Sequence, residues 1–148
     1  MRDLSDNEIK QFLEEWTWGT LIAMDGDKPY AIELSYATDG QFIYCGSMPG
    51  GRMSRSVKDN TNAVFKVCDC PKDTSIFRAV IVEGTINKLT KRDEIVNGLR
   101  VLYKKLGIPE NRIERRADQL TVMRDKQSSF YRIAMEKLGG RALDINRK

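Results

Sequence analysis

The beginning of the chain has the spacing of apolar positions that is typical of an amphipathic helix. Apolar side chains recur every three to four residues, at Ile9, Phe12, Leu13 and Trp16. Ser5 precedes this stretch and Glu8 follows three residues later, which is the pattern of a capping box. We therefore predict a helix over about residues 6–15.

After this helix the period changes to that of β-strands. Apolar or alternating stretches at 19–24, 30–36 and 41–47 are separated by turn-forming sequences at 25–29 and 38–40. Three strands joined by such short turns predict an antiparallel meander.

The second half of the chain mixes both periods. We predict strands at 63–70, at 77–89 with a bulge or bend at Gly84, and at 129–137. Between them we predict a short helix at 52–59, a helix capped by Thr90 and ended by Gly107, and a basic amphipathic helix at 111–120. About six strands with peripheral helices, in one domain, is the simplest interpretation.

Composition narrows the function classes. Hydrophobic residues make up 41% of the 148 residues, and no apolar run approaches the roughly 20 residues of a membrane span. The net charge is only +4, whereas nucleic-acid-binding domains usually carry a stronger and more clustered excess. Residues 1–10 are polar and charged, so we expect no secretory signal there.

The chain contains no histidine, which excludes catalytic triads and metal sites built on that residue. Its three cysteines, Cys45, Cys68 and Cys70, form no even disulfide framework and favour a reduced cytoplasmic protein. Cys68 and Cys70 share one face of a strand, but a metal would need two further ligands, so small core residues are the favoured interpretation. Any redox or transfer chemistry must therefore come from other groups or from a cofactor.

A glycine-bearing loop at 46–51 joins a predicted strand to a short helix that starts at Arg52. Glycines allow close backbone approach, and the free N–H groups at a helix start attract anions. Ser47 adds a hydroxyl, and Arg52 adds a planar guanidinium suited to phosphate. The pattern is compatible with a phosphate site or with an ordinary surface turn.

The order of these elements resembles the FMN-binding split-barrel family, whose members are pyridoxamine-5′-phosphate-oxidase-like. The resemblance rests on the Gly-Thr-Leu, Pro-Tyr-Ala-Ile-Glu-Leu and Ile-Tyr-Cys-Gly-Ser strands, the Gly-Gly-Arg loop and the last strand, and it covers about residues 4–141. Within the family, the nitroimidazole-resistance-type proteins are the most similar group. The resemblance implies a mainly β fold with peripheral helices, an antiparallel six-stranded split β-barrel, as one FMN-binding domain over residues 1–148.

The resemblance also implies a cofactor site. The second strand would lay its backbone along the flavin ring at Ala31, Ile32, Glu33 and Leu34. The loop and helix would hold the phosphate through Ser47, Gly51, Arg52 and the position of Met53, with Arg55 one helical turn further on. It further implies a homodimer with FMN at the subunit interface, and a small-molecule substrate or a nicotinamide donor as possible partners.

Three positions depart from the family pattern. Gly46 stands where many members have a histidine, and Glu33 stands where a neutral residue such as proline is more common. Met53 stands where lysine is common, so the phosphate site would lack one cation unless Arg55 or another basic residue replaces it.

Several functions remain open at this stage. The leading hypothesis is an FMN-dependent oxidoreductase, for which Tyr36, Tyr44 and Glu33 are the nearest acid–base candidates. The alternatives are a non-catalytic flavin-binding or storage protein and a deazaflavin-dependent reductase. A nucleic-acid-binding barrel is disfavoured because the strands lack aromatic residues within a basic stripe.

Two further groups are assigned structural roles. Trp16 and Trp18 are expected to pack in the core rather than to form a stacking platform. A basic region is expected to be a solvated face, although it could meet the pyrophosphate of a nicotinamide cofactor or a nucleic acid; its members are Arg112, Arg115, Arg116 and Arg124.

Overall fold

A computed structural model of the chain describes residues 1–47, 50–73, 75–122 and 129–144. Its strands are β1 (Arg2–Asp3), β2 (Trp18–Asp25), β3 (Lys28–Thr38), β4 (Phe42–Ser47), β5 (Asn62–Asp69), β6 (Ile76–Lys88), β7 (Ser129–Ala134) and β8 (Lys137–Asp144). Its helices are α1 (Asp6–Glu15), α2 (Arg52–Asp59), α3 (Arg92–Leu106) and α4 (Ile113–Val122), with a 3₁₀ turn at Glu110–Arg112.

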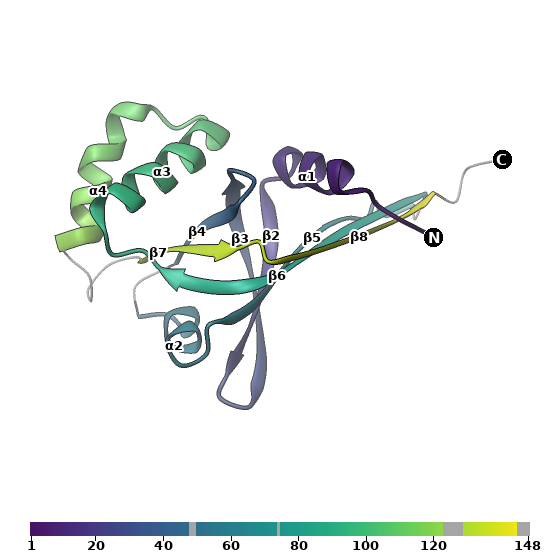
Figure 1. Cartoon of the computed structure of the whole chain (residues 1–148), viewed down its shortest axis with the longest axis horizontal. Helices are drawn as coiled ribbons and strands as arrows, with labels where there is room; N and C mark the ends of the chain where they lie inside the picture. Colours follow the sequence, from purple (N-terminus) through teal and green to yellow (C-terminus); the bar gives the residue numbers. More distant parts are fainter. Residues whose placement is uncertain (48–49, 74, 123–128, 145–148) are drawn as a thin grey trace.

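Six of these strands close into an antiparallel barrel. The order is β6-β5-β2-β3-β4-β7, and β7 pairs again with β6, while β8 and β1 extend the sheet beyond β6. Figure 1 shows α1 over one end of the barrel and the α3–α4 pair at the other side of the molecule. The predicted fold class, mainly β with peripheral helices around a six-stranded split barrel, is confirmed.

Gly84 lies where β6 changes partner. Strand β6 pairs with β8 over residues 76–83 and with β7 over residues 86–88. A Cβ atom at Gly84 would lie 1.7 Å from the carbonyl oxygen of Ala134, so no larger residue fits without a backbone shift. The glycine predicted to mark a bulge or bend is thus at the corner of the barrel.

Four details of the predicted elements are wrong. The stretch predicted as one last strand is two, β7 and β8, because the chain leaves one half of β6 and joins the other. Strand β1 was not predicted. The N-cap of α3 is Lys91 rather than Thr90, without a side-chain cap bond. Helix α4 begins at Ile113, because residues 110–112 form the 3₁₀ turn.

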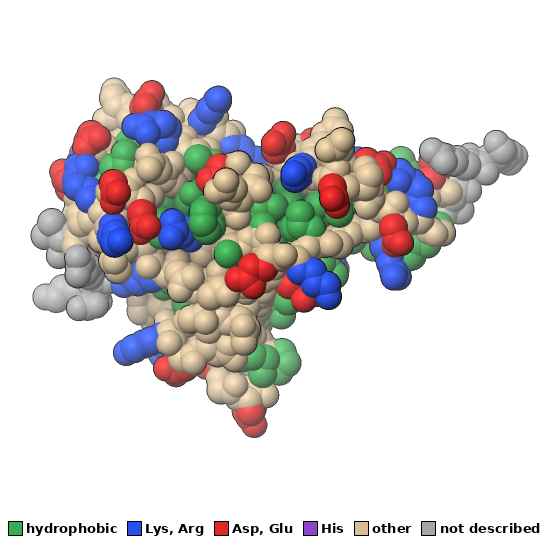
Figure 2. Space-filling model, viewed as in Figure 1, with side chains coloured by type: hydrophobic (Ala, Val, Ile, Leu, Met, Phe, Trp, Pro, Cys, Tyr) green, Lys and Arg blue, Asp and Glu red, His purple; other side chains and the backbone are tan. Residues whose placement is uncertain are grey.

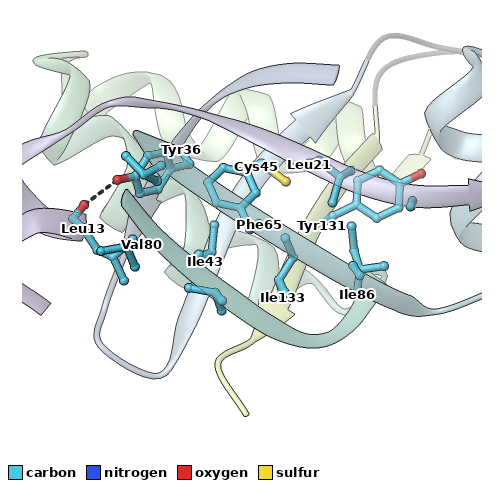
Figure 3. Close-up of a cluster of buried hydrophobic side chains, with 14 of the residues drawn as sticks. Leu13, Leu21, Tyr36, Ile43, Cys45, Phe65, Val80, Ile86, Tyr131 and Ile133 are labelled. Carbon is cyan, nitrogen blue, oxygen red and sulfur yellow. Dashed lines mark hydrogen bonds between the residues drawn. The ribbon is translucent and has the colours of Figure 1, made fainter. Parts of the chain in front are cut away.

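The main core fills the barrel (Figure 3). Tyr36 is fully buried there, packs edge-on against Phe65 with ring centroids 5.0 Å apart, and donates its hydroxyl to the Leu13 carbonyl at 2.8 Å. Leu13 belongs to α1, which starts with the predicted Ser5–Glu8 capping box. This bond therefore joins the end-covering helix to the barrel wall.

A second core lies between the α3–α4 pair and the outer side of β4 and β7. Tyr44 and Phe130 stack there with ring centroids 6.1 Å apart, while their sequence neighbours Ile43 and Tyr131 point into the barrel. Charged side chains of both signs are interleaved over this end of the molecule (Figure 2). No helix in the described ranges is long and apolar enough to cross a membrane.

Candidate functional site

The barrel is split between β3 and β4. Their ladder consists of the pairs Tyr36–Cys45, Ala37–Tyr44 and Thr38–Ile43, and it ends there. The other half of β3, residues 28–35, pairs with β2 alone in the described ladders. This half of β3 therefore presents an open backbone edge toward the end of β4.

The register identifies which backbone groups face that open edge. The β2–β3 hairpin closes on the Asp25–Lys28 pair around a two-residue turn, and the Tyr36 amide donates to the Thr17 carbonyl. Even-numbered residues of β3 therefore bond to β2, and odd-numbered ones point the other way. The N–H and C=O groups of Ala31 and Glu33 thus face the split.

A cavity of about 540 Å³ lies along this edge. Tyr30, Ile32 and Leu34 line it from β3, and these three side chains also pack against the barrel core. The remaining lining residues are Glu33, Gly46, Ser47, Gly51, Arg52, Met53 and Arg116. Apart from Glu33, the cavity is thus lined by apolar and aromatic side chains along β3, and it receives Ser47, Arg52 and Arg116 from β4, α2 and α4.

Arg52 is held at the cavity by the β2–β3 hairpin. Its Nε donates to Asp25 Oδ2 at 2.6 Å, and its guanidinium carbon lies 4.6 Å from the centroid of the Tyr30 ring. Both partners flank the turn of one hairpin. Asp25 is bonded to Nε, so the two terminal nitrogens of the guanidinium can still form a bidentate pair with a phosphate.

Ser47 is held by a short polar chain. Its hydroxyl lies 3.2 Å from that of Ser54 on α2, and Tyr131 of β7 donates to the same Ser54 hydroxyl at 3.2 Å. This chain joins β4, α2 and β7. It fixes the end of β4 beside the first turn of α2.

The first turn of α2 begins at the cavity. Gly51 is its N-cap, with no side chain to satisfy the first free N–H groups, and the first turn carries no acidic residue. Gly50 before it has a φ of 61°, a conformation that glycine adopts at little cost. The start of α2 is therefore a positive backbone end without a capping side chain or an acidic residue of its own.

The structure brings most of the predicted site residues together. Ile32, Glu33, Leu34, Ser47, Gly51, Arg52 and Met53 all line the cavity, and Ala31 presents its backbone to the open edge. Arg55 is not among the lining residues, because its side chain donates to the Gly50 carbonyl at 3.3 Å. In this structure Arg55 thus contacts the loop before α2, and its role as the replacing cation stays a prediction.

The structure shows the surroundings of two positions that depart from the family pattern, Met53 and Gly46. Met53 borders the cavity, but it is only 2% exposed and packs in the barrel core, a setting that suits an apolar side chain better than a lysine ammonium. A Cβ atom at Gly46 would lie 3.7 Å from the nearest atom, the Ser129 carbonyl oxygen, so a side chain would fit there. The close packing of the backbone therefore does not require glycine at position 46.

The candidate acid–base residues are mostly remote from the cavity. Burial strongly raises the pKa of Tyr36, and burial, with a hydrogen bond to Asp39, raises the pKa of Tyr44 to about 12. Neither tyrosine lines the cavity. Glu33 is exposed, and its carboxylate accepts a hydrogen bond from Thr20 on the neighbouring strand. The two tyrosines are therefore not proton donors for this site.

The cysteines and tryptophans differ in part from their predicted roles. Cys45 is buried, which raises the pKa of its thiol to about 12, but Cys68 and Cys70 are exposed rather than core residues. Trp16 is half-buried against Phe12, while Trp18 is 62% exposed. Within the described ranges, no three His, Cys, Asp or Glu residues are grouped to hold a metal.

Sequence reasoning missed three residues of the site. Tyr30 and Asp25 were assigned to a strand start and a turn, and only the folded hairpin places both against Arg52. Arg116 was assigned to a solvated basic face, together with Arg112 and Arg115. Arg124, the fourth member of that region, lies outside the described residues.

A larger cavity of about 730 Å³ lies beside the N-terminal segment, β6 and β8. Its charged residues are of both signs, Asp3, Asp6 and Glu83 with Lys66, Lys137 and Arg141. The helix start beside it belongs to α1, whose first turn is closed by the Ser5–Glu8 capping box and carries the acidic Asp6 and Glu8, so it does not favour an anion. The split between β3 and β4 is therefore the better candidate for a ligand with a flat hydrogen-bonding ring and an anionic end.

The sequence profile of the pyridoxamine 5′-phosphate oxidase family matches residues 5–142. The chain belongs to this family. The match spans the barrel, its helices and most of β8. A search of curated proteins found no match to the chain.

Solved structures of the same fold include flavin proteins. An FAD-binding protein from Mesorhizobium loti has a TM-score of 0.73 at 22% identity, with 95% of each chain covered. An FAD-binding protein from Mycobacterium smegmatis has a TM-score of 0.72 at 14% identity, covering 98% of this chain and 100% of that one. A candidate 5-nitroimidazole antibiotic resistance protein from Bacteroides thetaiotaomicron has a TM-score of 0.74 at 9% identity, covering 95% and 86%.

Proposed function

We propose that this protein is an FMN-binding flavoprotein that uses the bound flavin for electron transfer to or from a small molecule. The observation that carries the proposal is the split between β3 and β4, where an open backbone edge runs toward Arg52 and the start of α2. The family membership and the flavin-binding proteins among the solved structures support it.

The residues present fit a flavin mononucleotide. The backbone groups of Ala31 and Glu33 match the donors and acceptors at the edge of an isoalloxazine ring, and Ile32 and Leu34 supply apolar surface beside it. Arg52, Ser47 and the first N–H groups of α2 suit the phosphate. When bound, FMN supplies two-electron redox chemistry, and the protein supplies orientation and exclusion of water.

A second copy of the chain would complete the site. The cavity is open to solvent, and the outer face of β2, β5 and β6 carries exposed apolar side chains, among them Trp18 and Ile81. A further cavity of about 550 Å³ lies on that face, lined by Ile22, Met24 and Val64. We therefore propose a homodimer with FMN at its interface, and a cytoplasmic location in keeping with the two exposed free thiols.

Absorption spectroscopy and ligand titration test the flavin. We expect flavin absorption bands in the purified protein, and FMN bound more tightly than riboflavin by the protein freed of ligand. Arg52→Ala should weaken FMN binding by about 1.5–3 kcal/mol, the value of a charge-assisted hydrogen bond, and weaken riboflavin much less. Lys58→Ala, in the exposed last turn of the same helix, is the matched control. Equal losses for FMN and riboflavin would show that Arg52 does not bind the phosphate.

Turnover separates an enzyme from a flavin-storage protein. Oxidation of a reduced nicotinamide by the FMN-loaded protein supports the oxidoreductase, whereas tight FMN binding without turnover on any donor supports storage. The storage alternative is favoured by one feature: in the described lining, Glu33 is the one carboxylate, and it is bonded to Thr20. A preference for a deazaflavin over FMN in the same titration would instead indicate a deazaflavin-dependent reductase.

Light scattering tests the dimer. At micromolar concentration we expect about twice the chain mass of 16.9 kDa. Val64→Glu, on the outer face of β5, should shift the protein toward monomer and weaken FMN binding together. A monomer that binds FMN as tightly as the wild type would contradict the shared site.

A further inference from the structure

Two arginines that lie far apart in the sequence line the same cavity. Arg52 starts α2, and Arg116 comes from α4, which is joined to the barrel through the α3–α4 pair. Arg52 is exposed and Arg116 is half-buried. The cavity thus receives guanidinium groups from two separate elements.

The packing of α4 turns Arg116 toward the cavity rather than toward solvent. The side of α4 that faces the second core carries its buried residues, Ile113, Ala117 and Leu120. Arg116 lies three residues after Ile113, at the border of this face, whereas Arg112 and Arg115 lie on the exposed side. Arg116 also donates to Gln119 at 3.2 Å, which restricts its guanidinium.

Two surface ion pairs connect α4 to the start of α3. Arg92, at the start of α3, donates to Glu114 at 2.6 Å and to Asp118 at 2.9 Å. These two acids lie four residues apart on α4, so both bonds contact one side of the helix. Arg116 therefore belongs to a helix that is attached to α3 at two points.

Charge counting shows why a second cation matters. A phosphate monoester carries about 1.5 to 2 negative charges at neutral pH. Arg52 is already paired with Asp25 at 2.6 Å, so this pair brings little net charge. Met53 is buried and Arg55 bonds to the Gly50 carbonyl. The start of α2 adds only about half a positive charge.

We propose that Arg116 is the second phosphate-binding residue of this site and that it sets the preference for phosphorylated flavins over riboflavin. The inference rests on the proposed flavin site and adds a residue that no sequence motif of the loop contains. Arg52, Ser47 and the start of α2 contact the phosphate from one wall, and Arg116 contacts it from α4. Arg116 thus supplies the positive charge that a lysine at position 53 would provide.

The experiment compares two adjacent arginines of one helix. Riboflavin, FMN and FAD are titrated separately into ligand-free wild type, Arg116→Gln and Arg115→Gln, at low and high salt. We expect Arg116→Gln to weaken FMN about tenfold or more at low salt, with riboflavin changed less than twofold. High salt should reduce the difference. Arg115→Gln, with the same loss of charge on the exposed side, should change all three ligands less than twofold.

FAD binding and the Arg116→Lys variant give further tests of the role of Arg116. A matching loss for FAD supports it, because FMN and FAD share the flavin-proximal phosphate. A loss for FAD with FMN unchanged overturns it, and so does an equal loss for FMN and riboflavin with an unchanged melting temperature. Arg116→Lys should restore part of the FMN affinity, which a purely structural role would not require.

The two proposals fail in different ways. If the wild type binds FMN and Arg116→Gln binds it equally well, the role of Arg116 is overturned while the flavin site stands. If the wild type binds none of the three flavins at millimolar concentration, both proposals are overturned.

Discussion

The carboxylate of Asp25 lies 2.6 Å from Nε of Arg52, so an acidic residue neutralises the arginine that faces the candidate phosphate position. Asp25 ends β2 and Arg52 starts α2. The pair fixes the guanidinium beside Tyr30, but it also places a negative charge close to any bound anion. Asp25 therefore has two opposite effects on ligand binding: it positions the guanidinium of Arg52, and its charge repels an anionic ligand.

Replacing Asp25 by asparagine tests this balance. The amide oxygen can still accept the bond from Arg52, while the negative charge is lost. We expect FMN to bind about 2- to 5-fold more tightly at low salt, with riboflavin unchanged, because only the phosphate experiences the lost repulsion. Isothermal titration at two salt concentrations measures both ligands. Weaker FMN binding would mean that the charged pair is needed to hold Arg52 in place.

Met53→Lys is expected to lower stability without improving the site. Met53 is 2% exposed and packs in the barrel core, so a lysine there must bury its ammonium or disturb the core. We expect a loss of about 2 kcal/mol or more in the free energy of unfolding. Met53→Leu, which keeps the apolar volume, should cost less than about 1.5 kcal/mol. Urea denaturation measures the free energy of unfolding of both variants. If Met53→Lys is as stable as Met53→Leu, the side chain at position 53 reaches solvent.

Gly84→Ala is expected to destabilise the barrel corner. A Cβ atom there would lie 1.7 Å from the Ala134 carbonyl oxygen, a backbone atom that cannot simply rotate away. We expect a loss of at least about 3 kcal/mol in the free energy of unfolding, or failure to fold. Gly139→Ala is the control, because it is also a strand glycine but has no atom within 4 Å of the added Cβ. Similar melting temperatures for the two variants would contradict the close approach of β6 and β7.

Lys105 is expected to make stability depend on pH in the alkaline range. Its ammonium lies 4.2 Å from the centroid of the Tyr36 ring and donates to the carbonyls of Leu13 and Trp16. Burial nevertheless lowers the pKa of Lys105 from 10.5 to about 8, with Glu14 opposing this shift. Between about pH 8 and 10.5 the unfolded chain therefore holds a proton that the folded chain has lost. Stability should rise with pH across this window.

A comparison with Lys105→Met isolates this contribution. Other groups titrate in the same range, but they are common to both proteins and cancel in the difference. We expect the free energy of unfolding of the wild type, relative to Lys105→Met, to increase from pH 8 to pH 10.5. A difference that decreases over this range would mean that the two carbonyls and the Tyr36 ring hold the charged form more strongly than burial opposes it.

Local features of the chain were predictable because their causes are local. The capping box of Ser5 and Glu8, the start of α2 at Arg52 and the left-handed end of α3 at Gly107 each depend on a few neighbouring residues. That residues 31–34 would lie beside a flavin came from the resemblance to the family and not from the pattern along the strand. The six-stranded barrel followed from the order of such elements and from the resemblance to the family.

The tertiary structure decided everything that depends on partners far along the chain. Whether 129–137 is one strand or two depends on β6, which offers a different partner on each side of Gly84. Whether Arg116 reaches the cavity depends on the docking of α4, and no spacing in the sequence encodes that distance. The sequence alone determined which residues can carry charge or form strands, because these are properties of each residue and its neighbours. Only folding determined which charges meet, because Asp25, Arg52 and Arg116 come together through packing of the whole barrel.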